Sequence, residues 1–174
     1  MDLPSPIFRA PTTVISKNVL FYCGRSLGCV PLKAAYTFNV VTKEKCRKAD
    51  MLIARESHAI VYHNGIVYAF GSTEAAEMFS SDHNVWTKLK DLPFMTSFTA
   101  ASLYLDEIWV AGEVTYKASA FSIATQTHRV VDIYLSLSRK PYRFLINLGE
   151  ILYIFTSNNN IMKVINREGE HSII

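Results

Sequence analysis

The stretch HAIVYHNGIVYAFGS, residues 58–72, decides how this sequence is expected to fold. β-branched, aromatic and small residues fill positions 58–63 and 66–70, and Asn64-Gly65 stands between these two runs. Asn and Gly tolerate positive φ, which both central residues of a type I′ turn require. The stretch therefore predicts a β-hairpin with a two-residue turn, followed by an abrupt stop at Gly71.

Two further runs continue this pattern after Gly71. EAAEMFSS (74–81) and VWTKLKDLP (85–93) predict a third and a fourth short strand, and Pro93 closes the last one because proline cannot donate to a strand ladder. Four consecutive strands joined by short turns predict one antiparallel sheet.

The same arrangement recurs along the chain. Second strands end at Gly24, Gly71 and Gly112, and Thr156 holds the matching place in a fourth copy, at intervals of 47, 41 and 44 residues. Each of these strands follows a turn pair: Lys17-Asn18, Asn64-Gly65, Asp106-Glu107 and Gly149-Glu150. Downstream, an apolar anchor and a second large residue stand seven positions apart: Phe38 and Lys45, Phe79 and Trp86, Phe121 and His128, Val164 and His171. A pattern that recurs at a nearly fixed period indicates one structural unit per copy. We number the copies units 1 to 4, approximately 3–50, 51–93, 94–138 and 139–174.

These spacings resemble the kelch repeat, in which an Arg and a hydrophobic strand precede a second strand that ends in a Gly pair, followed by a Tyr and a Trp seven residues apart. Unit 2 matches best, through Arg55, Gly71, Phe79 in the Tyr position and Trp86 in the Trp position. The other units are degraded. Each of the first three keeps one Gly of the pair, the fourth keeps none, and the Trp is replaced by Lys45, His128 and His171.

The resemblance implies an all-β fold, with residues 1–174 forming a single kelch-like domain of four four-stranded antiparallel blades. A blade buries both faces against its neighbours, so we expect the repeat glycines to allow sharp bends where blades crowd together, and the Tyr and Trp positions to fill the wedge between blades. Three assemblies stay open: a small closed ring, one part of a larger propeller completed by another chain or by self-association, and an open arc.

Length and composition favour one globular domain, since the chain has 174 residues, of which 49% are hydrophobic and 19% charged. No apolar run approaches the roughly 18 residues that cross a bilayer, and MDLPSPIFRA lacks the blocks of a signal peptide. We therefore expect no membrane association and a cytoplasmic or nuclear location. Cys23, Cys29 and Cys46 form no CxxC pair, which favours reduced thiols.

Charge is distributed unevenly along the chain. Residues 1–50 hold eight Lys and Arg against three acidic residues, whereas the remainder holds ten against twelve. The densest basic run is KEKCRK, residues 43–48. It could contact phosphates or an acidic partner, but a solvated strand end and loop is the simpler interpretation, and nucleic acid binding is not favoured.

The residues that could carry chemistry show no catalytic pattern. The five histidines form no HxH or HExxH spacing, and the carboxylates are scattered. Some kelch-like propellers carry an oxidase site made of copper and a tyrosine, or a sugar epimerase site. The residues for either site are not in place here. We expect no metal, no cofactor and no enzymatic activity.

Function is then expected on the loops at the rim, which follow the second strand of each unit at 25–34, 72–74, 113–119 and 157–160. The residues suited to contact a protein partner are Arg25, Lys33, Tyr116, Lys117 and Asn159. The main hypothesis is a kelch-type adaptor or scaffold that binds a ubiquitin-ligase or cytoskeletal component. The alternatives are a structural subunit of a larger assembly and, least favoured, a propeller enzyme.

Overall fold

The computed structural model describes residues 10–24, 26–27, 30–94, 99–112, 117–132, 144–149, 151–155, 161–164 and 171–173. The first two units each form one four-stranded antiparallel sheet. Unit 1 contains β1 (Thr12–Ser16), β2 (Val19–Cys23), β5 (Ala35–Asn39) and β6 (Lys45–Lys48). Unit 2 contains β7 (Ala59–His63), β8 (Ile66–Phe70), β9 (Glu77–Ser80) and β10 (Val85–Lys88).

The last two units repeat this arrangement. Unit 3 contains β11 (Ala100–Tyr104), β12 (Glu107–Ala111), β13 (Lys117–Ser122) and β14 (Thr127–Asp132). Unit 4 contains β15 (Phe144–Leu148), β16 (Ile151–Phe155), β17 (Ile161–Val164) and β18 (His171–Ile173). In every unit the strands lie side by side in chain order, so the all-β architecture of four antiparallel blades is confirmed.

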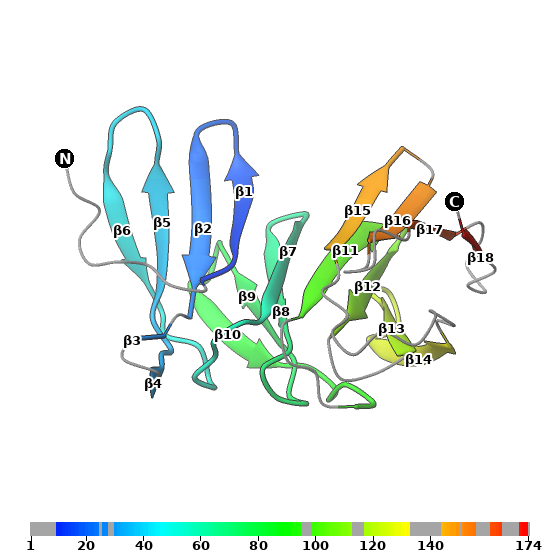
Figure 1. The fold of residues 1–174 in the computed structure, drawn as a ribbon. Coiled ribbons are helices and arrows are strands. Elements are labelled where there is room, and N and C mark those ends of the chain that lie inside the picture. Colours follow the sequence, from blue (N-terminus) through cyan, green and yellow to red (C-terminus); the bar gives the residue numbers. More distant parts are fainter. Residues whose placement is uncertain are drawn as a thin grey trace.

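The four sheets follow one another along an arc (Figure 1). The first strands of consecutive units are neighbours, because β1 contacts β7, β7 contacts β11, and β11 contacts β15. Within the part of the chain that the structure describes, the sheets do not close into a ring. Of the three assemblies left open by the sequence, the isolated chain therefore has the open arc. In the part of the chain that the structure describes, no helix is long and apolar enough to span a membrane.

The turn that the opening stretch predicts is present. Asn64 has φ 46° and Gly65 has φ 83°, and His63 pairs with Ile66 across the turn. One turn prediction is wrong by a residue, because Tyr104 pairs with Glu107 and the turn residues are Leu105 and Asp106.

The reason for this shift is that Glu107 belongs to β12 and forms an ion pair across the sheet. Its carboxylate lies 2.6 Å from Arg129 Nη2, and Leu105 adopts the positive φ of 57° that the turn needs. In this register Ile108 and Val110 are fully buried between units 2 and 3, and Glu107 stays in the sheet with its ion pair.

The residue pairs spaced by seven positions are direct cross-strand partners in the third and fourth strands. This holds in all four units: Phe38 with Lys45, Phe79 with Trp86, Phe121 with His128, and Val164 with His171. The spacing is constant because the same number of residues connects the two strands each time. It therefore marks one structural position per blade.

Apolar residues are buried mainly between units. The ring centroid of Phe21 in unit 1 lies 5.1 Å from that of Phe79 and 6.2 Å from that of Trp86. Trp86 is only 5% exposed. Phe121 of unit 3 packs in the same way against Tyr68 and Phe70 of unit 2, at 6.0 and 5.5 Å. The Tyr and Trp positions of the repeat thus fill the wedge between blades, as expected.

The repeat glycines lie where the next unit begins. Gly24 (φ 61°) follows β2 and Gly71 (φ 92°) follows β8. A Cβ added to Gly24 would lie 2.5 Å from His58 Cε1, and one added to Gly71 would lie 1.8 Å from Thr99 Oγ1. His58 and Thr99 each stand one residue before the first strand of the following unit. The abrupt stop at Gly71 is therefore architectural. Gly112 also follows its second strand and is buried.

Candidate protein-binding rim

The first rim loop carries a secondary structure that the sequence did not predict. Its two short strands, β3 (Ser26–Leu27) and β4 (Val30–Pro31), pair in an antiparallel hairpin at the lower edge of unit 1 in Figure 1. Val30 is 59% exposed, and Lys33, just beyond the hairpin, is exposed as well. The loop therefore offers an apolar and a cationic side chain close together in the sequence.

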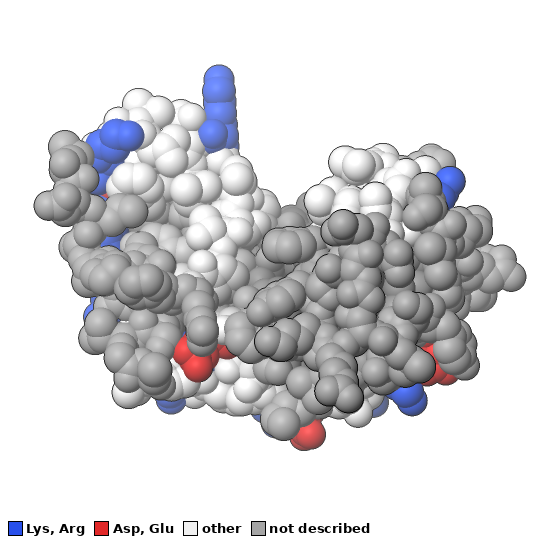
Figure 2. Space-filling view, in the orientation of Figure 1, with Lys and Arg blue, Asp and Glu red and all other residues white. Residues whose placement is uncertain are grey.

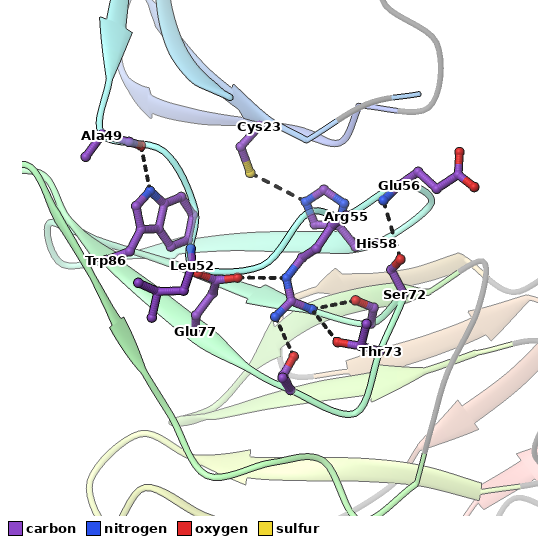
Figure 3. A network of polar contacts seen from close by, with 12 residues as sticks. Cys23, Ala49, Leu52, Arg55, Glu56, His58, Ser72, Thr73, Glu77 and Trp86 are labelled. Atoms are coloured by element: carbon purple, nitrogen blue, oxygen red, sulfur yellow. Dashed lines mark hydrogen bonds and ion pairs between the residues drawn. The ribbon is translucent and has the colours of Figure 1, made fainter. Parts of the chain in front are cut away.

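Arg55 is the polar centre of the rim, and its side chain is fully buried (Figure 3). Arg55 Nε lies 2.9 Å from Glu77 Oε1, and the second oxygen of this carboxylate accepts the backbone N–H of Leu52 at 2.8 Å. Arg55 Nη1 donates to the carbonyl oxygen of Gly71 at 2.6 Å, and Nη2 donates to that of Ala75 at 2.5 Å. Each end of the guanidinium is thus bound to a different part of unit 2.

These contacts join the first two rim loops. The backbone N–H of Arg55 donates to the Leu32 carbonyl at 3.1 Å, and that of Met51 donates to the Lys33 carbonyl at 2.8 Å. The side chain of Arg55 meanwhile binds the loop 71–75, and Glu56 N donates to Ser72 Oγ at 3.4 Å. One buried residue therefore joins the described parts of both loops.

A buried Cys–His pair lies beside this network. Cys23 Sγ is 3.5 Å from His58 Nε2, and both residues are buried between units 1 and 2. Burial lowers the pKa of His58 to about 3, and the positive charge of Arg55 acts in the same direction. Burial also raises the pKa of the Cys23 thiol, and the charge of Glu77 adds to this effect. At neutral pH both groups are uncharged, and they serve as packing between blades.

The structure describes only part of the predicted site. Arg25, Tyr116 and Asn159 lie outside the described residues. Lys33 is exposed and lies within the loop 30–34, where its carbonyl accepts the backbone N–H of Met51. Lys117 was predicted in a loop over 113–119, but it begins β13, and its Nζ lies 3.8 Å from Asp132 on β14. That prediction is wrong because pairing with β12 and β14 extends the strand to Lys117.

The structural positions of the repeat lie where the kelch resemblance implies. Arg55, Phe79 and Trp86 are buried, and the three repeat glycines follow their second strands. The sequence did not identify Glu77 as the partner of Arg55. A signal was present, because Glu77 is an acidic residue two positions before the repeat aromatic Phe79, in a run that is otherwise apolar or small.

Basic side chains are conspicuous on unit 1. Figure 2 shows Lys and Arg side chains standing out at the unit 1 end of the molecule. Part of the basic run 43–48 forms β6, in which Lys45 Nζ lies 3.9 Å from the centre of the Tyr36 ring and Arg47 pairs with Asp50 at 2.8 Å. Within the segments that the structure describes, no group of three or more His, Cys, Asp or Glu side chains could hold a metal ion.

Comparison with known proteins gives one partial relative and a clear structural neighbour. No family model matches the chain. Over 110 residues the chain is 26% identical to alpha-scruin of Limulus polyphemus, covering 59% of this chain and 11% of that protein. The solved structure of YjhT is similar with a TM-score of 0.75 at 12% sequence identity, covering 98% of this chain and 66% of that one. The chain is therefore a weak, partial homologue of alpha-scruin and has a propeller-like all-β fold.

Proposed function

We propose that this chain is a non-catalytic protein-interaction module of the kelch type, acting as an adaptor or scaffold through the rim that Arg55 organises. The observation that carries the proposal is the buried Arg55, whose backbone N–H donates to the Leu32 carbonyl in the loop 30–34 while its guanidinium donates to the loop 71–75. Ordering loops before a partner arrives reduces the entropy lost on binding, so a rim held in this way suits recognition. The partial similarity to alpha-scruin supports an interaction module.

The chemistry of the rim indicates the class of partner. Lys33 supplies a cation and Val30 an exposed apolar side chain, and both lie on the same short loop. An acidic or amphipathic protein segment can satisfy both at once, with its carboxylate on the ammonium group and an apolar side chain against the valine. Among the partners that the kelch resemblance implies, we place a cytoskeletal component first and a ubiquitin-ligase component second.

The experiment compares a rim variant with a matched control in affinity purification from the native cell. The rim variant carries Val30→Asp and Lys33→Glu, and the control carries Val85→Asp and Lys88→Glu on β10, where both side chains are also exposed. We expect the rim variant to lose partners that the control retains. A complete set of partners with the folded rim variant contradicts the proposed rim. Co-sedimentation with actin filaments and with microtubules then tests the cytoskeletal assignment separately.

A further inference from the structure

The arc ends in two sheet faces that no neighbouring unit covers among the described residues. In unit 1, Phe21 and Cys23 point into the cluster shared with unit 2, so alternate residues of the sheet point away from the arc. In unit 4, Leu152 and Ile154 point into the cluster shared with unit 3. We call the face of unit 1 that points away from unit 2 the head face. It includes Val14, Leu20, Phe38 and Lys45, and also Tyr22, which is only 8% exposed and stacks on Tyr36. We call the free face of unit 4 the tail face, formed by Ile146, Leu148, Ile151, Tyr153 and Phe155.

The tail face repeats the aromatic pair that unit 2 presents to unit 3, with one difference in charge: Lys163 is opposite Tyr153, where Met78 is opposite Tyr68. Strands β8 and β16 align from Ile66 and Ile151 onward, so Tyr153 takes the place of Tyr68 and Phe155 takes the place of Phe70. The residue types are identical. In unit 2 these two rings hold Phe121 of unit 3, at centroid distances of 6.0 and 5.5 Å. The tail face therefore carries the same aromatic pair, and among the described residues no ring from a following unit packs on it.

The head face carries the matching ring. Phe38 occupies the repeat position of Phe121, since each pairs with the residue seven positions later, Lys45 in one case and His128 in the other. His128 contacts a carbonyl oxygen of the preceding unit through Nε2, at 3.1 Å from Lys90 O. Lys45 is exposed, and its ammonium group can donate to a carbonyl of a docked unit in the same way.

Exposure at both faces differs from the exposure at the same positions inside the arc. Ile146 is opposite Tyr153 as Val61 is opposite Tyr68, yet Ile146 is 42% exposed and Val61 is 8% exposed. Val14 is opposite Leu20 and is 60% exposed, whereas its counterpart Leu103 packs against the cluster between units 2 and 3. Val14 and Ile146, whose counterparts inside the arc pack between units, are thus left in solvent at the two ends.

We propose that the tail face of one copy of this chain packs on the head face of a second copy. This head-to-tail contact would repeat the unit 2 to unit 3 contact, with Tyr153 and Phe155 of one copy around Phe38 of the other. Two copies hold about eight units, the upper end of the usual range of propeller blades. A heterologous contact of this kind closes into a ring if the rotation between copies allows it, and otherwise extends into a chain.

The experiment blocks one face at a time. Val14→Asp places a charge on the head face and Ile146→Asp places one on the tail face, at side chains that are exposed in the single chain. We expect the unaltered protein to form dimers or larger species at high micromolar concentration in native mass spectrometry and sedimentation. Each variant alone should be monomeric, because neither has a functional head and tail together.

Mixing the two variants gives the decisive result. The free tail of the Val14→Asp chain can bind the free head of the Ile146→Asp chain, so an equimolar mixture should form a heterodimer and nothing larger. Val85→Asp on β10, at a side chain that is 48% exposed in an internal unit, is the matched control and should assemble like the parent. A strictly monomeric parent overturns the proposal, and so does a dimer formed by either folded variant alone. Should Val14→Asp not fold, Lys45→Glu replaces it.

Discussion

The contact between units 1 and 2 and the contact between units 2 and 3 use the same positions of the repeat with different residues. In the first, Trp86 donates its indole N–H to the Ala49 carbonyl at 2.9 Å. In the second, His128 holds the same position and contacts the Lys90 carbonyl at 3.1 Å. Both acceptors lie just after the fourth strand of the preceding unit. In both contacts the position is held by a flat ring with a polar nitrogen at its edge, Trp in one case and His in the other.

The two contacts differ more in how well they are buried. Trp86 is almost fully buried and packs on Phe21 and Phe79, whereas His128 is only half-buried beside Phe121. His128 has a second contact, at 2.8 Å between its Nδ1 and Ser119 Oγ. Replacing a large apolar ring by a small polar one thus exchanges buried area for hydrogen bonds, which individually contribute less to stability.

The largest expected effect lies in the network that supports the first contact. Arg55→Ala leaves Glu77 buried without its ion-pair partner, and we expect the free energy of unfolding to fall by about 3 to 5 kcal/mol. Urea unfolding followed by tryptophan fluorescence measures it. Arg55→Met combined with Glu77→Leu should recover much of the loss, and Arg47→Ala, which removes an exposed pair, should leave the midpoint unchanged. Equal stability of Arg55→Ala and the parent contradicts the role given to Arg55.

The second prediction compares the two rings directly. Trp86→Ala should lower the free energy of unfolding by about 3 to 5 kcal/mol, since it empties a well-packed site. His128→Ala should cost about 1 kcal/mol, because the site is partly open to water. Thermal melts followed by circular dichroism of both variants test the order. A loss of stability in His128→Ala as large as that in Trp86→Ala would contradict the difference in burial between the two contacts.

The third prediction concerns the glycine at the second contact. Gly71→Ala combines a positive φ with a close approach to Thr99, and we expect a loss of about 2 to 3 kcal/mol in the free energy of unfolding. Gly65→Ala has a similar φ but nothing within 4 Å of the added Cβ, so it should cost only about 1 kcal/mol. Chemical denaturation of the pair separates crowding from backbone strain. If the two losses are equal, the close approach to Thr99 at Gly71 does not affect the free energy of unfolding.

The effect that is smallest near neutral pH is a pH dependence at the first contact. Below pH 6.5, the ordinary pKa of His, the unfolded chain binds a proton at His58, whereas the folded chain does not until the pH nears 3. The free energy of unfolding should therefore fall as the pH falls through this window, at up to about 1.4 kcal/mol per pH unit. Removing the imidazole in His58→Gln should flatten this slope relative to the parent in parallel denaturation series. Identical slopes would show that His58 is not buried as described.

Much of the fold could be predicted from local patterns. The Asn64-Gly65 turn is confirmed because its chemistry permits only a few conformations, and the seven-residue spacing is confirmed because it fixes a cross-strand pair in each unit. The shifted turn at Leu105 could not be predicted, since Asp106 is an equally good turn residue in either register. The register is selected by contacts that β12 makes with other strands, such as the ion pair between Glu107 on β12 and Arg129 on β14.

The candidate site was less predictable for the same reason. Lys33 was identified from its residue type, but its relation to the loop 71–75 depends on Arg55, which reaches both segments only after the units pack. The β3–β4 hairpin could not be predicted because each of its strands has two residues, which is too short to show a periodic pattern in the sequence.

The sequence by itself determined the number of units, the strand pairs within them and the positions that face a neighbour, because these depend on turn chemistry and on side-chain periodicity over short distances. Only the tertiary structure decided the partners of Arg55, Trp86 and His128, and the open ends of the arc. Those features depend on contacts between different loops and units, such as Arg55 with Glu77 and Trp86 with Ala49, whose geometry is set by how twisted sheets pack on one another.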